Sequence, residues 1–347
     1  VSILHFFHAS IRSGSSNETR ESRPLKLKVE LSNFDHEHRR TRILISPDGS
    51  RILHHYENDS NEEDGVSGER GLHVQELNQL NPQKLIPGNA FSNKPFWKYD
   101  SQEVGYIVDG RLWAVDINGG QARPIATLPE GFRWHPWAEG GGAWLSDGRI
   151  VFTEGRGAPA AGLWEVSDSA GDPNLILGLE EGEVAFKCPS PLPDGRGVVF
   201  LVESESNETD IIAVYTEGER KTVFELPGES FAFVVYDPRG YLLFDRASTS
   251  PGIWALPFSL DGMNRTGEPP FLVADGTDPS VSEDGTLLYL EGTSSHDTVT
   301  HQLVWLNEEG NVERIPDMRS QPMGRNVRLS ADDTQALVEV FDNDRKQ

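Results

Sequence analysis

The stretch ISPDGSRIL, residues 45–53, decides the fold because its pattern returns along the whole chain. A lead-in that contains Ser or Pro is followed by Asp-Gly or a relative of it, and then by an apolar strand. Gly accepts positive φ without cost and Asp bonds to its own backbone, so the pair favours a tight turn between antiparallel strands. The other copies are WKYDSQEVGYI (97–107), LSDGRIVF (145–152), LPDGRGVVF (192–200), YDPRGYLLF (236–244), VSEDGTLLY (281–289) and LSADDTQALV (329–338).

The turn aspartates recur at intervals of 43 to 52 residues, which is too regular for chance. They are Asp48, Asp100, Asp147, Asp194, Asp237, Asp284 and Asp332. Two copies depart from Asp-Gly, since Asp100 is followed by Ser and Asp332 by Asp. The residues predicted to build the repeated turn are the pairs Asp48 and Gly49, Asp147 and Gly148, Asp194 and Gly195, and Asp284 and Gly285.

Each of the first six units contains two further strand patterns after the turn. The third strand alternates apolar and polar residues, as a half-buried strand should, and its copies cover 71–77, 111–117, 162–168, 210–216, 252–258 and 302–308. The fourth strand follows at 83–88, 122–128, 174–179, 221–227, 270–276 and 312–317. Four strands in a unit of about 47 residues is the arithmetic of a propeller blade. The sequence therefore predicts an all-β propeller of about seven blades, within a range of six to eight.

The seventh unit is incomplete, because the sequence stops about where its third strand should begin. One explanation is that the early strand LKLKVEL (25–31) closes the ring by pairing with the last blade. The other is that the native protein continues beyond residue 347. Both can hold together.

Composition narrows the possible partners. Over 347 residues the formal net charge is −24, which argues against DNA or RNA and against an anionic membrane surface as partners, since both need a basic face. Cys188 is the only cysteine, so no disulfide can form within the chain.

The first 23 residues differ from the rest, and we predict that they form a lead or linker before a propeller of residues 24–347. Residues 1–9 (VSILHFFHA) are apolar but too short to span a bilayer. They are either the end of a transmembrane segment that anchors the protein upstream of residue 1, or a buried strand or disordered end. Residues 10–23 are polar, as a linker would be.

The repeat resembles the WD40-like repeat of the TolB type. Over roughly residues 95–347, runs such as PFWKYDSQEVGYIVDGRLWAVDINGGQARPI (95–125) are similar to the extracytoplasmic propeller of membrane-anchored bacterial serine/threonine kinases. In that family a kinase domain, one transmembrane helix and the propeller follow one another. The resemblance implies a sensor or scaffold on the extracytoplasmic, periplasmic side of a bacterial membrane, which binds a protein or a small molecule at the propeller mouth.

No catalytic constellation is found in the sequence. The chain lacks the phosphate loop and the catalytic loop of a kinase, and it lacks the G-x-S-x-G elbow of a serine hydrolase. We therefore expect no enzyme activity and no cofactor in these residues. Two alternatives stay open: the propeller half of a prolyl-oligopeptidase-type peptidase, whose hydrolase domain would follow residue 347, and a TolB-like module that binds envelope proteins.

Metal binding is not expected. His36 and His38 lie on one side of the first Asp-Gly turn, and His54 and His55 on the other. Neighbouring side chains on a strand point to opposite faces, so His54 and His55 cannot share a site. The acidic loop 57–65 (ENDSNEEDG) has its glycine one position late for a calcium loop. Runs of glycine at 140–142 and 155–162 lack the Lys-Ser/Thr of a phosphate loop and are interpreted as wide turns.

Tryptophans divide into two groups. Trp113, Trp164 and Trp254 occupy one slot of the repeat, which indicates packing between blades. A second group lies outside the repeat slot in a long connection, where exposed aromatic rings beside basic side chains suit a ligand. The candidate ligand-binding residues are Arg133, Trp134, His135 and Trp137, near the predicted mouth of the propeller.

Overall fold

The computed structural model describes the chain in segments: 2–5, 25–28, 43–57, 70–79, 82–87, 95–130, 132, 140–154, 161–205, 210–246, 250–291, 300–301, 304–306, 312–314, 321–329 and 336–340. Within them the structure is strand and tight turn, with one short 3-10 turn, Pro193–Gly195, and no α-helix. These segments contain no helix with the length and apolar character needed to cross a membrane. The chain packs as two units, Val1–Ser294 and Ser295–Gln347.

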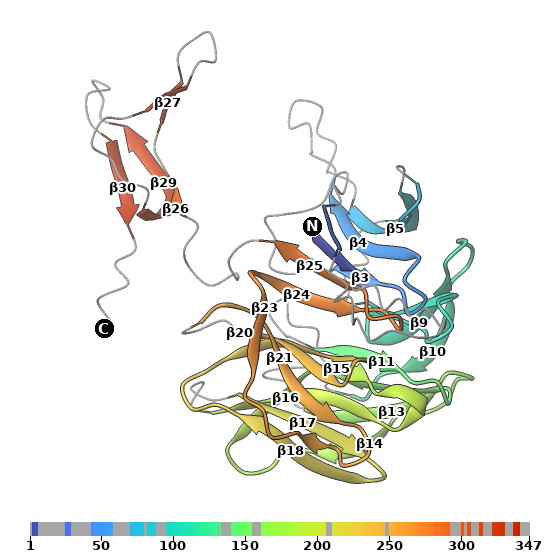
Figure 1. Ribbon diagram of the computed structural model, residues 1–347. Coiled ribbons are helices and arrows are strands. Elements are labelled where there is room, and N and C mark those ends of the chain that lie inside the picture. The colour runs from blue at the N-terminus through green and yellow to red at the C-terminus, as the bar shows by residue number, and fades with distance from the viewer. Residues whose placement is uncertain are drawn as a thin grey trace, which may run out of the picture. The chain divides into compact units, whose positions relative to one another are not determined.

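Five blades of the first unit are each built from consecutive strands that pair antiparallel (Figure 1). Blade 1 is β3 (Ile43–Ile45), β4 (Arg51–Glu57), β5 (Arg70–Glu76) and β6 (Gln83–Pro87). Blade 2 is β7 (Phe96–Trp97), β8 (Glu103–Val108), β9 (Arg111–Asp116) and β10 (Arg123–Thr127). Blade 3 is β11 (Gly141–Trp144), β12 (Arg149–Thr153), β13 (Gly162–Ser167) and β14 (Asn174–Gly178).

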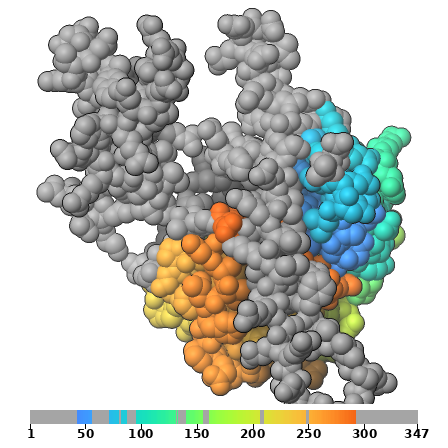
Figure 2. All heavy atoms as spheres, turned by 45° about the horizontal axis from the view of Figure 1, so that its top comes forward, coloured from blue at the N-terminus to red at the C-terminus, as the bar shows by residue number. Residues whose placement is uncertain are grey.

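Blades 4 and 5 follow the same order. Blade 4 is β15 (Glu183–Pro191), β16 (Val198–Ser204), β17 (Asp210–Thr216) and β18 (Glu219–Glu225). Blade 5 is β19 (Phe231–Asp237), β20 (Tyr241–Arg246) and β21 (Gly252–Ser259), with β22 (Asn264–Arg265) and β23 (Phe271–Ala274) both paired to β21. Figure 2 shows blade 1, in blue and cyan, and the residues up to 291 that follow β20, in orange, on one face of the molecule.

A sixth sheet, called here the closing sheet, joins strands from distant parts of the sequence. Its inner half is β24 (Gly276–Val281) and β25 (Leu287–Glu291), and its outer half is β1 (Ser2–His5) and β2 (Leu25–Lys28). β1 pairs antiparallel with β25, with Ser2 opposite Tyr289. For residues 1–9 the sequence left open whether they form a transmembrane end, a buried strand or a disordered end. The structure places strand β1 within them.

The inner strands of these six sheets follow one another around an axis. β7, β11, β15, β19, β24 and β3 contact in that order. Hydrogen bonds complete the circuit: the indole N–H of Trp97 donates to the Leu44 carbonyl, and the backbone N–H of Ile43 donates to Asp278 Oδ2. This arrangement confirms the predicted all-β propeller.

The predicted number of about seven blades is wrong. Five blades form from consecutive strands, and the sixth repeat contributes only β24 and β25 to the closing sheet. The segments expected as its third and fourth strands instead contain β27 (Val304–Leu306) and β28 (Val312–Arg314), which pair with each other in the second unit. The edge of β25 that they would have joined is taken by β1.

The seventh repeat likewise belongs to the second unit. There β29 (Gln321–Leu329) pairs with β26 (Thr300–His301) and with β30 (Ala336–Val340). N-terminal strands do complete a sheet, but it is the sixth and not the seventh. The predicted boundary between a lead and a propeller at residue 23 stays a prediction; β1 and β2, on either side of it, belong to one sheet.

Apolar clusters lie between neighbouring blades and hold the ring together. Phe224 of blade 4 contacts Phe231 and Phe244 of blade 5, with ring centroids 6.1 and 5.8 Å away. Full burial of one such side chain contributes about 1.5–3 kcal/mol. Trp113, Trp164 and Trp254 each pack against one of these clusters, as periodic aromatic residues in a propeller should.

Candidate functional site

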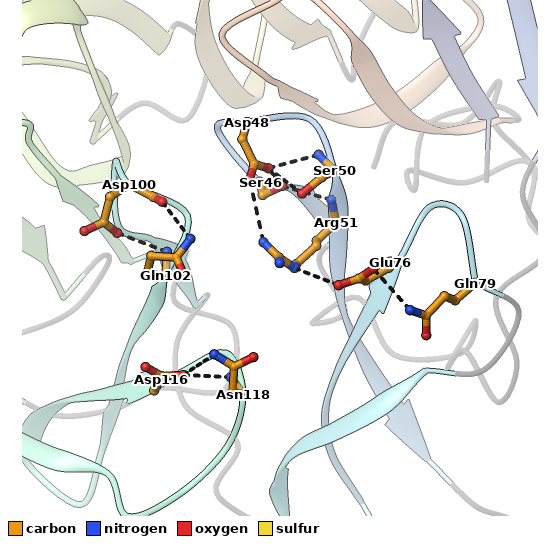
Figure 3. Close-up of polar contacts among 10 residues, drawn as sticks. All are labelled: Ser46, Asp48, Ser50, Arg51, Glu76, Gln79, Asp100, Gln102, Asp116 and Asn118. Atoms are coloured by element: carbon orange, nitrogen blue, oxygen red, sulfur yellow. Dashed lines mark hydrogen bonds and ion pairs between the residues drawn. The ribbon is translucent and has the colours of Figure 1, made fainter.

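Five of the six described turns share one hydrogen bond, which their aspartate accepts. Asp48 Oδ1 accepts a hydrogen bond at 3.0 Å from the backbone N–H two residues later, at Ser50 (Figure 3). The same bond recurs at Asp100, Asp147, Asp237 and Asp284, with partners Gln102, Arg149, Arg239 and Thr286. It is the local bond that makes Asp a turn residue.

The glycines of these turns occupy the left-handed region. Gly49, Gly148 and Gly285 have φ of 73°, 87° and 84°. In blade 2 the residue at this place is Ser101, which adopts φ of 61°. The replacement of Gly by Ser101 therefore keeps the turn geometry at the cost of backbone strain, because only Gly adopts this region freely.

The turns of blades 4 and 5 differ from the pattern. In blade 4, Asp194 and Gly195 both have positive φ, 58° and 65°. In blade 5, the carbonyl of Asp237 accepts the N–H of Gly240, so Asp237 opens its turn, whereas the carbonyl of Ser46 accepts the N–H of Gly49 and Asp48 lies two places further on. The fifth turn aspartate of the sequence repeat is therefore offset by two residues.

Contacts between turns link neighbouring sheets. The Ser101 hydroxyl accepts the backbone N–H of Asp48 at 3.0 Å, which joins blades 1 and 2. Arg149 of blade 3 donates to the Gly195 carbonyl of blade 4 at 2.7 Å. The N–H of Glu283 in the closing sheet donates to the Pro47 carbonyl of blade 1 at 2.8 Å.

These turns surround the mouth of a cavity on the propeller axis, which we call the axial cavity. Its volume is about 500 Å³, and all six inner strands line it. The second residue of every turn lies at its rim; these residues are Pro47, Tyr99, Ser146, Pro193, Pro238 and Glu283. The wall is built from the two residues before each turn, which are Leu44, Ile45, Phe96, Trp97, Ala143, Trp144, Ser190, Pro191, Val235, Tyr236, Ser280 and Val281.

The wall is apolar and aromatic, and its charges are few. Among the residues that line the axial cavity, the only charged side chains are the exposed carboxylates of Asp194 and Glu283. The lining contains six prolines and the single thiol, that of buried Cys188, which donates to the Ala232 carbonyl. Burial and the negative charge of Asp237 raise the pKa of Tyr236, so its phenol stays neutral.

The first glycine run contributes to this wall in an unforeseen way. Gly141 and Gly142 lie in β11 and line the axial cavity, where the sequence suggested a wide turn. A Cβ at Gly142 would lie 2.4 Å from the Phe96 ring, and one at Gly105 would lie 2.3 Å from it. Both glycines are therefore needed for space, because Phe96 packs between blades 2 and 3.

A second cavity, of about 700 Å³, lies where blades 3, 4 and 5 meet. Its lining is polar and its charges are mixed: Arg149 pairs with Glu165 at 3.0 Å, and Arg196 with Asp261 at 3.5 Å. Tyr215 donates to the Ile176 carbonyl at 3.1 Å. With cations and anions balanced, this cavity indicates no ligand class.

The histidines of blade 1 form a packed cluster. His54 and His55 are buried, and the His54 ring contacts that of His73 on the next strand edge to face at 5.5 Å. Burial lowers the pKa of His54 to about 4, so the ring is neutral near pH 7. In the parts of the chain that the structure describes, no three His, Cys, Asp or Glu side chains gather as metal ligands would.

Several predicted residues lie outside the described residues. They include the candidate ligand contacts Arg133, Trp134, His135 and Trp137, together with His36, His38 and most of the acidic loop 57–65. The residues that line the axial cavity were not predicted, although those at its rim follow a rule that is visible in the sequence. In each repeat the rim residue is a direct neighbour of the repeated Asp. It follows Asp237 in blade 5 and precedes the Asp in the other described repeats.

Comparisons with known proteins find similar solved structures but no related sequence. The sequence matches no protein-family model and no curated protein. The propeller domain of the Trilobed protease from Pyrococcus furiosus is 14% identical, with a TM-score of 0.48 over 79% of this chain and 81% of that one. A protein assigned as TolB from Agrobacterium tumefaciens is 12% identical, with a TM-score of 0.46 over 67% and 83%. A virginiamycin B lyase from Staphylococcus aureus is 13% identical, with a TM-score of 0.45 over 86% and 91%.

Proposed function

We propose that this chain is a non-catalytic binding module whose ligand enters the axial cavity. The observation that carries the proposal is the cavity itself, about 500 Å³ with contributions from all six sheets. Concave, largely apolar sites with a few polar groups are where proteins bind small molecules and protruding segments of partners. The partner class is therefore a small molecule or a short segment of another protein.

The chemistry of the wall supports binding over catalysis. Serine hydroxyls line the axial cavity at Ser146, Ser190, Ser280 and Ser282. Activation of a serine needs a neighbouring base, and the residues that line the cavity include no histidine or lysine. Ser280 and Ser282 are also engaged with backbone groups, which fixes them as structural side chains.

The biological setting follows from the sequence resemblance. We propose that the propeller is the sensor or scaffold region of a membrane-anchored serine/threonine kinase, on the extracytoplasmic side of the membrane. The alternatives are the propeller half of a prolyl-oligopeptidase-type peptidase and a TolB-like module for envelope proteins. The gene around these residues separates them: a kinase domain upstream favours the first, and a hydrolase domain downstream favours the second.

A variant whose axial cavity is partly filled by a larger side chain tests the proposal. Val235 is half-buried in the cavity wall, so Val235→Trp should occupy part of the space. The neutral fluorophore prodan, which becomes brighter in apolar surroundings, should bind the wild-type chain and bind Val235→Trp more weakly. Thr127→Trp is the matched control, because Thr127 is exposed on the outer strand of blade 2. Equal prodan binding by all three proteins would exclude the axial cavity as the site.

A further inference from the structure

Prolines reduce the number of backbone N–H donors in the wall of the axial cavity. The wall consists of strand edges, and a residue whose N–H points away from its partner strand normally offers both a donor and an acceptor. In blade 4 the N–H of Leu192 donates to Gly197 of the hairpin, so the residue before it, Pro191, turns toward the axis. Pro193 belongs to the turn, where its carbonyl accepts the N–H of Arg196, and neither proline has an N–H to give.

Side chains of neighbouring sheets use up further donors. The backbone N–H of Ile45 donates to the Ser280 hydroxyl at 3.0 Å, and that of Ile43 donates to Asp278 Oδ2 at 3.0 Å. At the rim, the N–H of Glu283 donates to the Pro47 carbonyl. The first two bonds each use a backbone N–H of the inner edge of blade 1. The bond from Glu283 uses one donor and one carbonyl, and the indole N–H of Trp97 uses the Leu44 carbonyl, so donors and acceptors of the wall are both reduced.

The two charges at the rim are both negative. Asp194 and Glu283 are exposed at the mouth, and among the described residues no ion pair involves either carboxylate. Nearby cations are held elsewhere: Lys98 pairs with Glu103 at 2.9 Å and Arg196 with Asp261 at 3.5 Å. The other acidic turns already carry partners, as Asp48 does with Arg51 and Asp147 with Arg149.

From this we infer that the ligand of the axial cavity carries a cationic N–H donor, an ammonium or a guanidinium group, on an apolar stem. The stem packs against the aromatic and proline wall, and the positive charge with its N–H groups lies near the carboxylates of Asp194 and Glu283. The inference rests on the proposed function, since it names the class of ligand for the same cavity.

Three peptides of one length distinguish the possibilities. The probes are capped Ala-Pro-Xaa-Pro-Ala peptides in which Xaa is lysine, norleucine or glutamate, so that lysine and norleucine differ by the charged amine. Binding is measured by ligand-observed NMR with the whole chain. We expect the lysine peptide to bind best and the glutamate peptide to bind least, with a preference that weakens as salt is added.

Variants of the rim supply the second arm of the experiment. Asp194→Asn and Glu283→Gln should each weaken the lysine peptide about three-fold, and together about ten-fold, as exposed ion pairs do. Asp172→Asn with Glu219→Gln is the control: it removes the same charge from exposed positions that do not line the cavity. An equal loss in the control pair would assign the preference to the overall negative charge and overturn the inference.

Failure of this inference can be distinguished from failure of the proposed function. If norleucine and lysine peptides bind equally well and Val235→Trp weakens both, the cavity binds ligands but does not select cations, and only the inference fails. If Val235→Trp changes neither the peptides nor prodan, the proposed function fails as well.

Discussion

The hydroxyl of Ser101 accepts a hydrogen bond from the backbone N–H of Asp48, and so the one described turn that lacks its glycine is tied to the turn of the neighbouring blade. The substitution that weakens the repeat in sequence therefore adds a contact between blades. Ser101 has φ of 61°, where a side chain costs about 1–2 kcal/mol relative to glycine. The hydrogen bond that the Ser101 hydroxyl accepts offsets roughly 1 kcal/mol of this cost.

Two substitutions separate the strain from the bond. Ser101→Ala keeps the strain and loses the bond, and should lower the free energy of unfolding by about 1 kcal/mol. Ser101→Gly loses the bond but relieves the strain, and should be close to wild type. Urea unfolding of the whole chain measures both, with Ser146→Ala in the turn of blade 3 as the control. A Ser101→Gly variant that is less stable than Ser101→Ala would contradict this account.

Phe96 should tolerate no side chain on either flanking glycine. Gly142→Ala places a Cβ against the ring, and overpacking of this kind costs about 1–3 kcal/mol. If the clash is the cause, the combination Phe96→Leu with Gly142→Ala should lose less stability than the sum of the single changes. Additive losses in thermal or urea unfolding would show that Gly142 matters for another reason.

Removal of the two side chains of the buried ion pair Lys187 and Asp210 should cost unequal amounts of stability. Asp210 Oδ2 accepts from Lys187 Nζ at 3.2 Å, and also from the Phe231 N–H and the Ser230 hydroxyl. Asp210→Ala leaves the Lys187 charge buried without its carboxylate and removes the acceptor for the start of β19, so it should cost about 3–5 kcal/mol. Lys187→Met should cost less, because the carboxylate keeps its other two donors.

Asp261→Ala is the matched control for that pair. Asp261 is almost fully exposed and pairs with Arg196 at 3.5 Å, so its loss should cost less than about 1 kcal/mol. A larger loss for Lys187→Met than for Asp210→Ala would reverse the assignment of roles.

His54 should make the protein sensitive to acid. Burial lowers its pKa from 6.5 to about 4, so the folded chain stays neutral at this ring while the unfolded chain takes up a proton near pH 6.5. Stability is complete above pH 6.5 and is lost as the pH falls toward 4, by about 3 kcal/mol for this group. His54→Gln cannot titrate, so it should lose less stability between pH 7.5 and 4.5 than the wild type. Urea unfolding at a series of pH values measures the difference, and parallel curves for both proteins would contradict it.

The strands and turns could be predicted from the sequence because they depend on neighbours. Asp48-Gly49 and its copies form turns through bonds between residues two or three places apart. The number of blades could not be predicted in this way. Whether β1 or the segment 304–306 lies beside β25 depends on pairing between distant residues, and both segments have a strand pattern.

The axial cavity could not be predicted as a set of residues for a related reason. Alternation of apolar and polar residues shows which faces of a blade are buried, but not which edge faces the axis. The role of Gly142 was hidden as well, since its space is filled by Phe96 from another blade. The net charge of −24 was visible at once and argued against nucleic acid and anionic membrane surfaces as partners, whereas the two carboxylates at the rim could be located only in the structure.

The closing sheet sets the order in which the protein can mature on the ribosome. β1 and β2 are synthesised before any other described strand, yet their partner β25 ends at residue 291. At translation rates of about 5–20 residues per second, these segments wait on the order of tens of seconds with unpaired edges. The five blades between them can fold meanwhile, since each uses consecutive strands. Joining the first strands to β25 is then a late event, and until it occurs β1 and β25 lack their native partners along one edge.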